Sequence, residues 1–248
     1  MGSLAEVVCV LGSDTGVGKT TITRLLLRHA ELMGLGVVAL KPFSSGGRED
    51  AEALLGGQEN KADLDLINPW HYDAPFAPLI AARMGGRAIP DMAEVVTWID
   101  LHRQRNQLVL MEGVGGLLTP IAERFSMLDI IGAIGGRLVV VVRNRLGAIN
   151  QARMCYVTSK QCHVAQGILV LSGLEDADSS ARTNRAAIEE FCPQWTVLEL
   201  PYVGKIGLGA NGTKTIAKKF KKTLAQILQG GRNVPVLCET NCGSESGG

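Results

Sequence analysis

A glycine-rich stretch close to the start of the chain restricts the possible folds more than any other feature. It runs Leu11-Gly12-Ser13-Asp14-Thr15-Gly16-Val17-Gly18-Lys19-Thr20-Thr21. The apolar run before it, from Val7 to Leu11, predicts a buried strand, and the apolar spacing from Ile22 to Leu27 predicts a helix. A strand, a glycine-rich turn ending in Gly-Lys-Thr and a helix follow one another in the phosphate-binding loops of nucleotide-binding proteins. We therefore expect this stretch to bind a nucleoside triphosphate.

The residue types in this loop suit phosphate chemistry. Glycines let backbone N–H groups surround phosphate oxygens, and the N-terminus of the helix adds a dipole that favours anions. Lys19 is placed to lie along the β- and γ-phosphates, and the Thr20 hydroxyl is placed to ligate Mg²⁺. Ser13 stands where the usual pattern has its first glycine, and Gly12 comes one place earlier. A chance Gly-x-Gly-Lys-Thr is the alternative, which the flanking strand and helix disfavour. The loop residues predicted to hold the nucleotide are Asp14, Thr15, Gly16, Val17, Gly18, Lys19, Thr20 and Thr21.

The rest of the chain alternates aliphatic strands with helices. Hydrophobic residues make up 46% of the sequence but aromatic residues only 4%, which fits an aliphatic α/β core. This alternation predicts a doubly wound α/β fold, a mostly parallel sheet with helices on both faces, of the P-loop NTPase type. We expect one domain over residues 1–228 and a disordered polar tail over residues 229–248. The other strands are predicted at residues 37–40, 107–111, 137–142, 164–171 and 195–200.

The second predicted strand ends at Lys41-Pro42. Ligands bind at the carboxyl ends of strands in open parallel sheets, so Lys41 is a functional candidate as well as an ordinary strand end. A flexible turn is predicted at residues 44–47, followed by a helix from Arg48. Asp50 in its first turn either complements the helix dipole or ligates Mg²⁺. Three prolines between Asn68 and Pro78 predict an ordered loop that shapes the wall of a pocket.

A second acidic candidate stands at the end of the strand predicted at residues 107–111. It is Glu112, and the glycine-rich segment Gly113, Val114, Gly115 and Gly116 comes directly after it. A carboxylate at this edge of the sheet can meet Mg²⁺ beside the phosphate loop, and glycines allow close approach of backbone to phosphate or substrate. A simple turn is the alternative, but an unpaired buried carboxylate is costly. We favour a functional role.

Charge and composition exclude several classes of partner. The chain has 25 Lys and Arg against 24 Asp and Glu, a net charge of +1, so electrostatics give no argument for nucleic acid or an anionic membrane. The sequence shows no apolar run near 18 residues and no signal-peptide pattern, so we expect a cytoplasmic protein. The six cysteines form no Cys-x-x-Cys pair and are assigned no role.

A lysine-rich helix at residues 216–227 is predicted to dock on the sheet rather than on a membrane.

Five motifs occur here in one order: the phosphate loop, Lys41-Pro42, the Asn68–Pro78 segment, the Glu112 segment and Leu146-Gly147-Ala148-Ile149-Asn150. Together, over about residues 7–204, they resemble the dethiobiotin synthetase family, whose own P-loop variant is Gly-x-Asp-Thr-Gly-Val-Gly-Lys-Thr. No lysine occupies position 14, unlike the loops of partition-type ATPases. The resemblance implies that 7,8-diaminopelargonate, CO₂ and ATP give dethiobiotin, ADP and phosphate with Mg²⁺, through a carbamate and a carbamic-phosphoric anhydride.

The resemblance also implies roles for single residues. Lys41 and Lys19 would be catalytic, Lys41 by bridging the carbamate and the γ-phosphate and Lys19 by holding the β/γ-phosphates. Thr20, Asp50 and Glu112 would hold Mg²⁺. The diamine would contact Thr15, Ser45, Gly147, Ile149 and Asn150, and the nucleotide would contact Glu112, Gly113, Val114, Gly115, Pro201, Tyr202 and Val203 in addition to the loop. Family members are dimers with substrate sites at the interface, so a homodimer is expected.

Two positions depart from the family pattern, and two other functions remain as alternatives. Leu171 stands where many relatives carry an adenine-recognising Asn, and Lys205 stands where an acid is common, which leaves the nucleotide preference open.

An amidating synthetase of the cobyrinate diamide type is one alternative, but about 20 residues of tail leave no room for its glutaminase domain. A non-enzymatic nucleotide-dependent switch or partitioning protein is the other. Lys41 with the proline-rich segment favours the enzyme.

Overall fold

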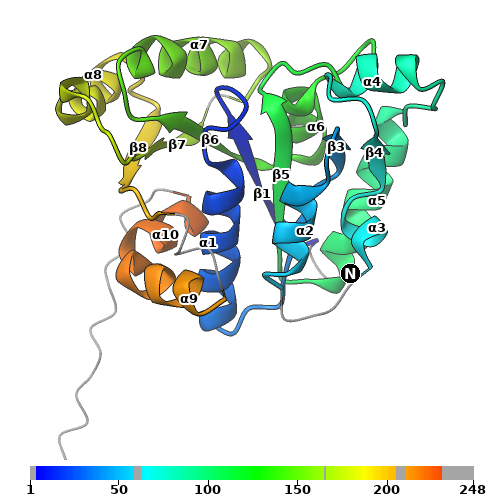
Figure 1. Cartoon of the computed structure of the whole chain (residues 1–248), viewed down its shortest axis with the longest axis horizontal. Coiled ribbons are helices and arrows are strands. Elements are labelled where there is room, and N and C mark those ends of the chain that lie inside the picture. The colour runs from blue at the N-terminus through cyan, green and yellow to red at the C-terminus, as the bar shows by residue number, and fades with distance from the viewer. Residues whose placement is uncertain (1–3, 59–62, 165, 205–209, 231–248) are drawn as a thin grey trace, which may run out of the picture.

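A six-stranded parallel sheet forms the centre of the molecule (Figure 1). The computed structural model describes residues 4–58, 63–164, 166–204 and 210–230 of the 248-residue chain. The strand order is β2-β5-β1-β6-β7-β8, and every neighbouring pair is parallel. The strands are β1 (Glu6–Gly12), β2 (Val37–Leu40), β5 (Leu108–Gly116), β6 (Arg137–Arg143), β7 (Gly167–Ser172) and β8 (Trp195–Leu200).

Helices cover both faces of this sheet, which confirms the predicted doubly wound fold (Figure 1). Helix α1 packs on one face with α9 and α10 beside it, and α5 and α6 pack on the other. The helices are α1 (Lys19–Leu32), α2 (Glu49–Leu55), α3 (Leu64–Ile67), α4 (Pro78–Met84), α5 (Met92–Arg105), α6 (Met127–Ile134), α7 (Ala148–Gln161), the 3₁₀ helix η1 (Ser179–Arg182), α8 (Asn184–Phe191), α9 (Ala210–Lys219) and α10 (Lys221–Leu228).

The two central strands are buried throughout their apolar runs. Residues 7–11 of β1 and residues 138–142 of β6 are almost completely inaccessible, because helices cover both sides of them. Their carboxyl ends therefore open onto one edge of the sheet, at the top of Figure 1, where the glycine-rich loop lies. In the part of the chain that the structure describes, no helix is long and apolar enough to cross a membrane.

The structure corrects two expectations about local structure. Residues 44–47 and the proline-rich segment are not only turn and loop, because β3 (Phe43–Ser45) and β4 (Trp70–Tyr72) pair as a separate two-stranded parallel sheet. Strands of three residues are too short to show an alternating pattern. The helix predicted over residues 216–227 is two helices, which meet at Phe220. Leu224 and Ile227 of α10 are buried, so this segment docks on the protein core as expected. Residues 231–248 of the predicted tail lie outside the described residues.

Candidate active site

The phosphate loop connects β1 to α1 with a tightly folded backbone. A Cβ on Gly12 would lie 2.6 Å from the Asp14 carbonyl oxygen, so glycine is required one place earlier than in the usual pattern. Gly16 (φ 70°) and Gly18 (φ 105°) adopt the left-handed conformation that favours glycine. Arg143, at the end of β6, donates two hydrogen bonds to the Gly16 carbonyl, with Nε at 3.2 Å and Nη2 at 2.6 Å. The sheet thus holds the loop at its carboxyl edge, and Arg143 is a site residue that sequence reasoning missed.

Lys19 opens α1 and lies beneath the loop. Its Nζ donates to the carbonyl oxygens of Asp14 and Gly115, each at 3.0 Å, which ties the loop to the end of β5. Burial, followed by the charge of Lys41, lowers the pKa of Lys19 to about 8 although nearby carboxylates raise it. A phosphate anion placed over the loop would stabilise the charged form of this lysine.

Lys41 lies at the carboxyl end of β2 between two carboxylates. Its Nζ donates to Glu112 Oε1 at 2.7 Å, to Asp50 Oδ2 at 3.0 Å and to the Gly113 carbonyl at 3.1 Å, which uses all three of its protons. Glu112 is fully buried and Lys41 is 2% exposed. Burial opposes the charge on Lys41, but Glu112 and Asp50 outweigh it and raise the pKa of Lys41. The buried amine therefore remains an ammonium ion.

Thr20 completes this cluster. Its Oγ1 lies 2.8 Å from Asp50 Oδ1 and 2.8 Å from Glu112 Oε1, although a hydroxyl has one proton to donate. Burial opposes the ionisation of Asp50, but Lys41 and the hydrogen bond from Thr20 hold the pKa of Asp50 below its usual value. The predicted magnesium residues are thus brought together, with more acceptor oxygens than protons between them.

This cluster fits a hard divalent cation. Glu112 Oε2 is buried and has no hydrogen-bond partner among the described residues. Mg²⁺ takes oxygen ligands, commonly one or two carboxylates completed by phosphate oxygens and water. Among all the residues that the structure describes, no group of three or more His, Cys, Asp and Glu side chains is arranged to hold a metal. A pair of carboxylates with one hydroxyl is therefore the arrangement that the site offers.

Asn68 supports the cluster from below, a role that no sequence pattern indicated. This fully buried side chain donates from Nδ2 to the Lys41 carbonyl at 2.6 Å. Its Oδ1 accepts from Ser44 Oγ and from Arg48 Nε, both at 2.9 Å. Arg48 directly precedes α2, which carries Asp50. Asn68 therefore connects the segment that carries Lys41 to the segment that carries Asp50.

A cavity of about 690 Å³ opens above these groups. It has the phosphate loop on one side and the proline-rich segment, with Pro75 and Phe76, on the other. Glu112 and Gly113 do not line it, but both accept hydrogen bonds from Lys41, which does. Eleven predicted site residues line the cavity: Thr15, Gly16, Gly18, Lys19, Thr20, Thr21, Lys41, Ser45, Asp50, Val114 and Gly115.

A second cavity of about 370 Å³ continues from the loop past the ends of β7 and β8. Val17 lines it together with the three residues predicted on the side of the base, Pro201, Tyr202 and Val203. Leu171 is fully buried in the core, so the residue at the cavity is its neighbour Ser172. Lys205 lies outside the described residues. The two cavities share the loop, as one elongated nucleotide requires.

Gly147, Ile149 and Asn150, which are predicted to contact the diamine, lie apart from both cavities. Gly147 (φ 94°) directly precedes α7, and Ile149 and Asn150 lie in its first turn. None of the three lines either cavity in a single copy of the chain. Their contact with the diamine stays a prediction, and a second copy of the chain would have to bring them to a cavity.

The chain has clear relatives. A family model described as "AAA domain" matches residues 6–208. The ATP-dependent dethiobiotin synthetase BioD of Anaeromyxobacter sp. (strain K) is 35% identical over 213 residues, which cover 84% of this chain and 95% of the relative. The enzyme of the same name from Mycobacterium avium (strain 104) is 32% identical, over 77% of this chain and 86% of the relative.

Solved structures show the same fold at much lower identity. The MinD cell division protein of Aquifex aeolicus matches with a TM-score of 0.57 at 15% identity, over 93% of this chain and 99% of that protein. The MinC:MinD complex of the same organism gives a TM-score of 0.62 at 14% identity, over 94% of this chain and 98% of that one. At this identity the likeness concerns the fold alone, whereas the sequence relatives are 35% and 32% identical over 95% and 86% of their own length. The chain therefore belongs to the family of ATP-dependent dethiobiotin synthetases.

Proposed function

We propose that this chain catalyses the ATP-dependent carboxylation and ring closure of 7,8-diaminopelargonate with CO₂ to give dethiobiotin, ADP and phosphate. One observation carries the proposal beyond family membership. The buried ammonium of Lys41 lies at the base of a cavity that it shares with the phosphate loop. A switch that only binds and hydrolyses a nucleotide has no need of such a group beside an open cavity.

The two lysines supply charge where the reaction develops it. An amine of the substrate adds to CO₂ as a carbamate, ATP phosphorylates the carbamate, and the neighbouring amine closes the ring with loss of phosphate. Negative charge accumulates on the carbamate and on the transferred phosphoryl group. Lys19 lies under the phosphate loop and Lys41 lines the same cavity as the loop, so each can stabilise one of these charges.

Magnesium completes the proposed site. Thr20, Asp50 and Glu112 would hold the ion, since their oxygens outnumber the protons shared between them and Glu112 Oε2 has no hydrogen-bond partner among the described residues. When bound, Mg²⁺ neutralises charge on the phosphate oxygens. Thr15 and Ser45 line the cavity together with Lys41 and would contact the reacting end of the diamine. Phe76 and Pro75 offer an apolar wall to its alkyl chain.

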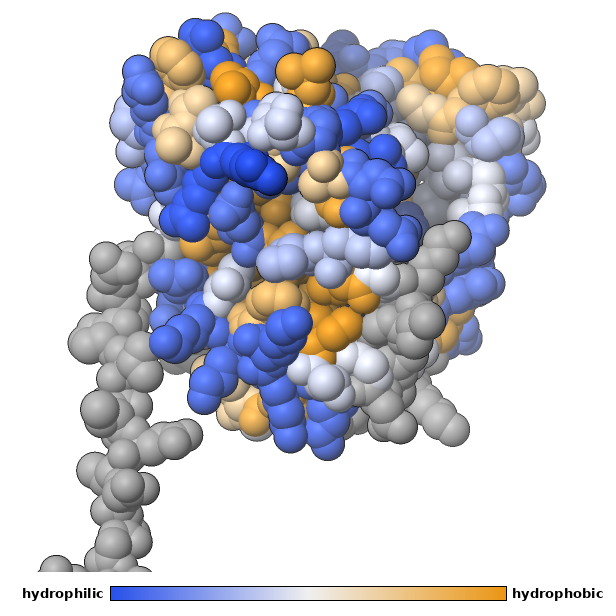
Figure 2. Space-filling view, turned by 60° about the vertical axis from the view of Figure 1, so that its left-hand side comes forward, coloured by the Kyte–Doolittle hydropathy of each residue, from blue (hydrophilic) through white to orange (hydrophobic). Residues whose placement is uncertain are grey.

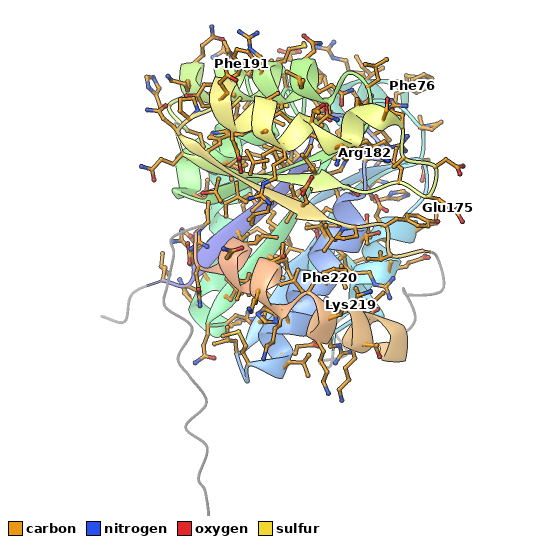
Figure 3. All side chains as sticks on the ribbon, turned by 90° about the vertical axis from the view of Figure 1, so that its left-hand side faces the viewer. Phe76, Glu175, Arg182, Phe191, Lys219 and Phe220 are labelled. Carbon is orange, nitrogen blue, oxygen red and sulfur yellow. The ribbon has the colours of Figure 1, made fainter. Side chains whose placement is uncertain are left out.

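A homodimer would complete the substrate site. Apolar side chains gather at the top of the molecule, the end at which α4 and α7 lie, and Phe76 and Phe191 lie at that end too (Figures 2 and 3). Large exposed apolar areas of this kind mark interaction surfaces. Exposed large apolar side chains occur on α4 (Ile80 and Met84) and on α7 (Met154 and Val157), and Phe76 and Phe191 are exposed as well. A second copy seated here would bring Gly147, Ile149 and Asn150 towards the cavity mouth.

Two further expectations stay with the proposal. The net charge of +1 gives no reason to expect nucleic acid as a partner. Lys219 and Phe220 lie where α9 and α10 meet (Figure 3), and Ala217, Leu224 and Ile227 of these helices pack into the core, so the helices dock on the protein itself. The cytoplasmic location also stays a prediction from the sequence.

Phosphate release tests the function directly. We expect release with ATP and Mg²⁺ to require both 7,8-diaminopelargonate and bicarbonate, and dethiobiotin to form in equal amount. Lys41→Ala should abolish release, and Lys41→Gln, which keeps two N–H donors near the carboxylates, should lose it as well while still binding ATP. Phosphate release that ignores the diamine would instead support a nucleotide switch.

A further inference from the structure

We propose that Glu49 is a substrate-binding residue whose carboxylate holds one of the two amino groups of the diamine. The inference rests on the proposed function and adds a specificity-determining contact to it. Glu49 is the first residue of α2, directly before Asp50, and it lines the larger cavity together with Lys41, Ser45 and Phe76. From the sequence alone, an acid in this position is an ordinary complement to the helix dipole.

The backbone before α2 is shaped to turn this carboxylate towards the cavity. The side chain of Glu49 folds back over Gly47, which also lines the cavity. A Cβ on Gly47 would lie 1.8 Å from Glu49 Oε2, inside the space that the carboxylate occupies. Any larger residue at position 47 would displace the carboxylate from the cavity side of the turn.

Glu49 is also the cavity carboxylate that has no internal partner. Asp50 and Glu112 are engaged by Lys41 and Thr20. Across the described residues, by contrast, the structure records no hydrogen bond or ion pair to the carboxylate of Glu49, which is exposed. The oxygens of Glu49 are therefore available to a ligand.

The chemistry of the substrate explains why such a carboxylate is needed. Alkyl amines are cationic near neutral pH, as the pKa of a lysine side chain shows. Lys19 and Lys41 also line the cavity, but the neighbouring carboxylates of Asp50 and Glu112 are already engaged by Lys41 and Thr20. Glu49 adds a free carboxylate to the same cavity, which can accept N–H hydrogen bonds, and such bonds are stronger when the acceptor is charged. The carboxylate of Glu49 thus offers a vicinal diamine one anionic group that is not already paired with Lys41.

Kinetics of Glu49→Gln test the proposal, with Glu52→Gln as the matched control. Both changes remove one negative charge from α2, but Glu52 is exposed and does not line the cavity. We expect Glu49→Gln to raise KM for the diamine about 10- to 100-fold, the loss expected for a hydrogen bond to a charged group. KM for ATP and the Mg²⁺ concentration for half activity should stay within about twofold of the wild-type values, a change worth less than 0.5 kcal/mol by RT ln 2. Glu49→Asp should lie between the wild type and Glu49→Gln.

Calorimetric titration of each variant with the diamine gives a readout without turnover, and the same decrease in affinity is expected there. Equal diamine affinity in Glu49→Gln and in the wild type would overturn the inference, and so would a defect that Glu52→Gln shares. A higher Mg²⁺ requirement with unchanged diamine affinity would overturn it too, because Glu49 would then act on the metal. Failure of the proposed function differs from all of these, since the wild-type chain itself would then release no diamine-dependent phosphate.

Discussion

Replacing Asn68 by Ala should both destabilise the fold and impair the site, because one buried amide supports two functional segments. The substitution removes the donor to the Lys41 carbonyl and the acceptor for Ser44 and Arg48. The structure records no other donor to that carbonyl oxygen in the residues it describes. An unsatisfied buried carbonyl costs about 1–3 kcal/mol, and each neutral hydrogen bond contributes about 1 kcal/mol.

These contributions set the expected size of the effect. The hydrogen bond from Arg48 is part-buried, and the arginine side chain is 23% exposed, so we assign it about 1 kcal/mol rather than the value for a fully buried charged pair. Together the losses predict that Asn68→Ala lowers the free energy of unfolding by about 3–5 kcal/mol. Ser44→Ala is the control, since it removes the bond to Asn68 together with the contact between Ser44 Oγ and His71 Nδ1, and should cost about 1–2 kcal/mol.

Urea unfolding measures both variants, and unchanged m-values would show that the comparison is sound. The kcat of Asn68→Ala should fall while its KM for ATP stays close to the wild-type value, because the phosphate loop does not contact Asn68. Destabilisation of less than about 1.5 kcal/mol, within the range of one ordinary hydrogen bond, together with an unchanged kcat would refute the reasoning.

Three other predictions follow from the described geometry. Removing divalent cations with a chelator should stop phosphate release, and Mg²⁺ should restore it; Ca²⁺ restoring it equally well would argue against a tight magnesium site. Burial lowers the pKa of His29, so the unfolded chain binds a proton first as the pH falls. The unfolding free energy should therefore be fully retained above about pH 6.5 and decline below it, less steeply in His29→Gln, as pH-dependent urea unfolding can measure. Leu146→Glu places a charge on the most exposed large apolar side chain, at 80%, and should shift the chain towards a monomer in sedimentation experiments; an unchanged dimer would place the interface elsewhere.

The sheet and the phosphate loop could be predicted because their signals are local and long. Buried parallel strands are nearly continuous aliphatic runs, and the loop combines glycines, Lys19 and a following helix in one stretch of sequence. The pair β3 and β4 was missed, since each strand has only three residues and their pairing joins segments about 27 positions apart. No local pattern of that length separates a short strand from an extended loop.

The site shows the same division between local and long-range information. Lys41 and Glu112 end predicted strands, so the rule for parallel sheets placed them at one edge, and the structure brings them to 2.7 Å. Asn68 and Arg143 act through hydrogen bonds to backbone carbonyls far away in the sequence, which neither periodicity nor residue type reveals. Gly147, Ile149 and Asn150 differ again, because a contact that a second copy would have to supply cannot be seen in one chain.

The buried ions at this site are better explained by chemistry than by stability. Taking the ammonium of Lys41 and the carboxylate of Glu112 out of water costs several kcal/mol per ion, and their mutual attraction often does no more than offset this. A well-packed apolar pair in place of Lys41, after β2, and Glu112, within β5, would hold the same strands at least as firmly. The same fold also occurs in the MinD cell division protein of Aquifex aeolicus, and a fold by itself does not determine a function. What needs a functional explanation in this chain is therefore the part around Lys41: the short strands β3 and β4, the amide of Asn68 and the start of α2. These elements keep a costly cation next to an open cavity, where the proposed reaction would use its charge to stabilise the carbamate and the phosphate.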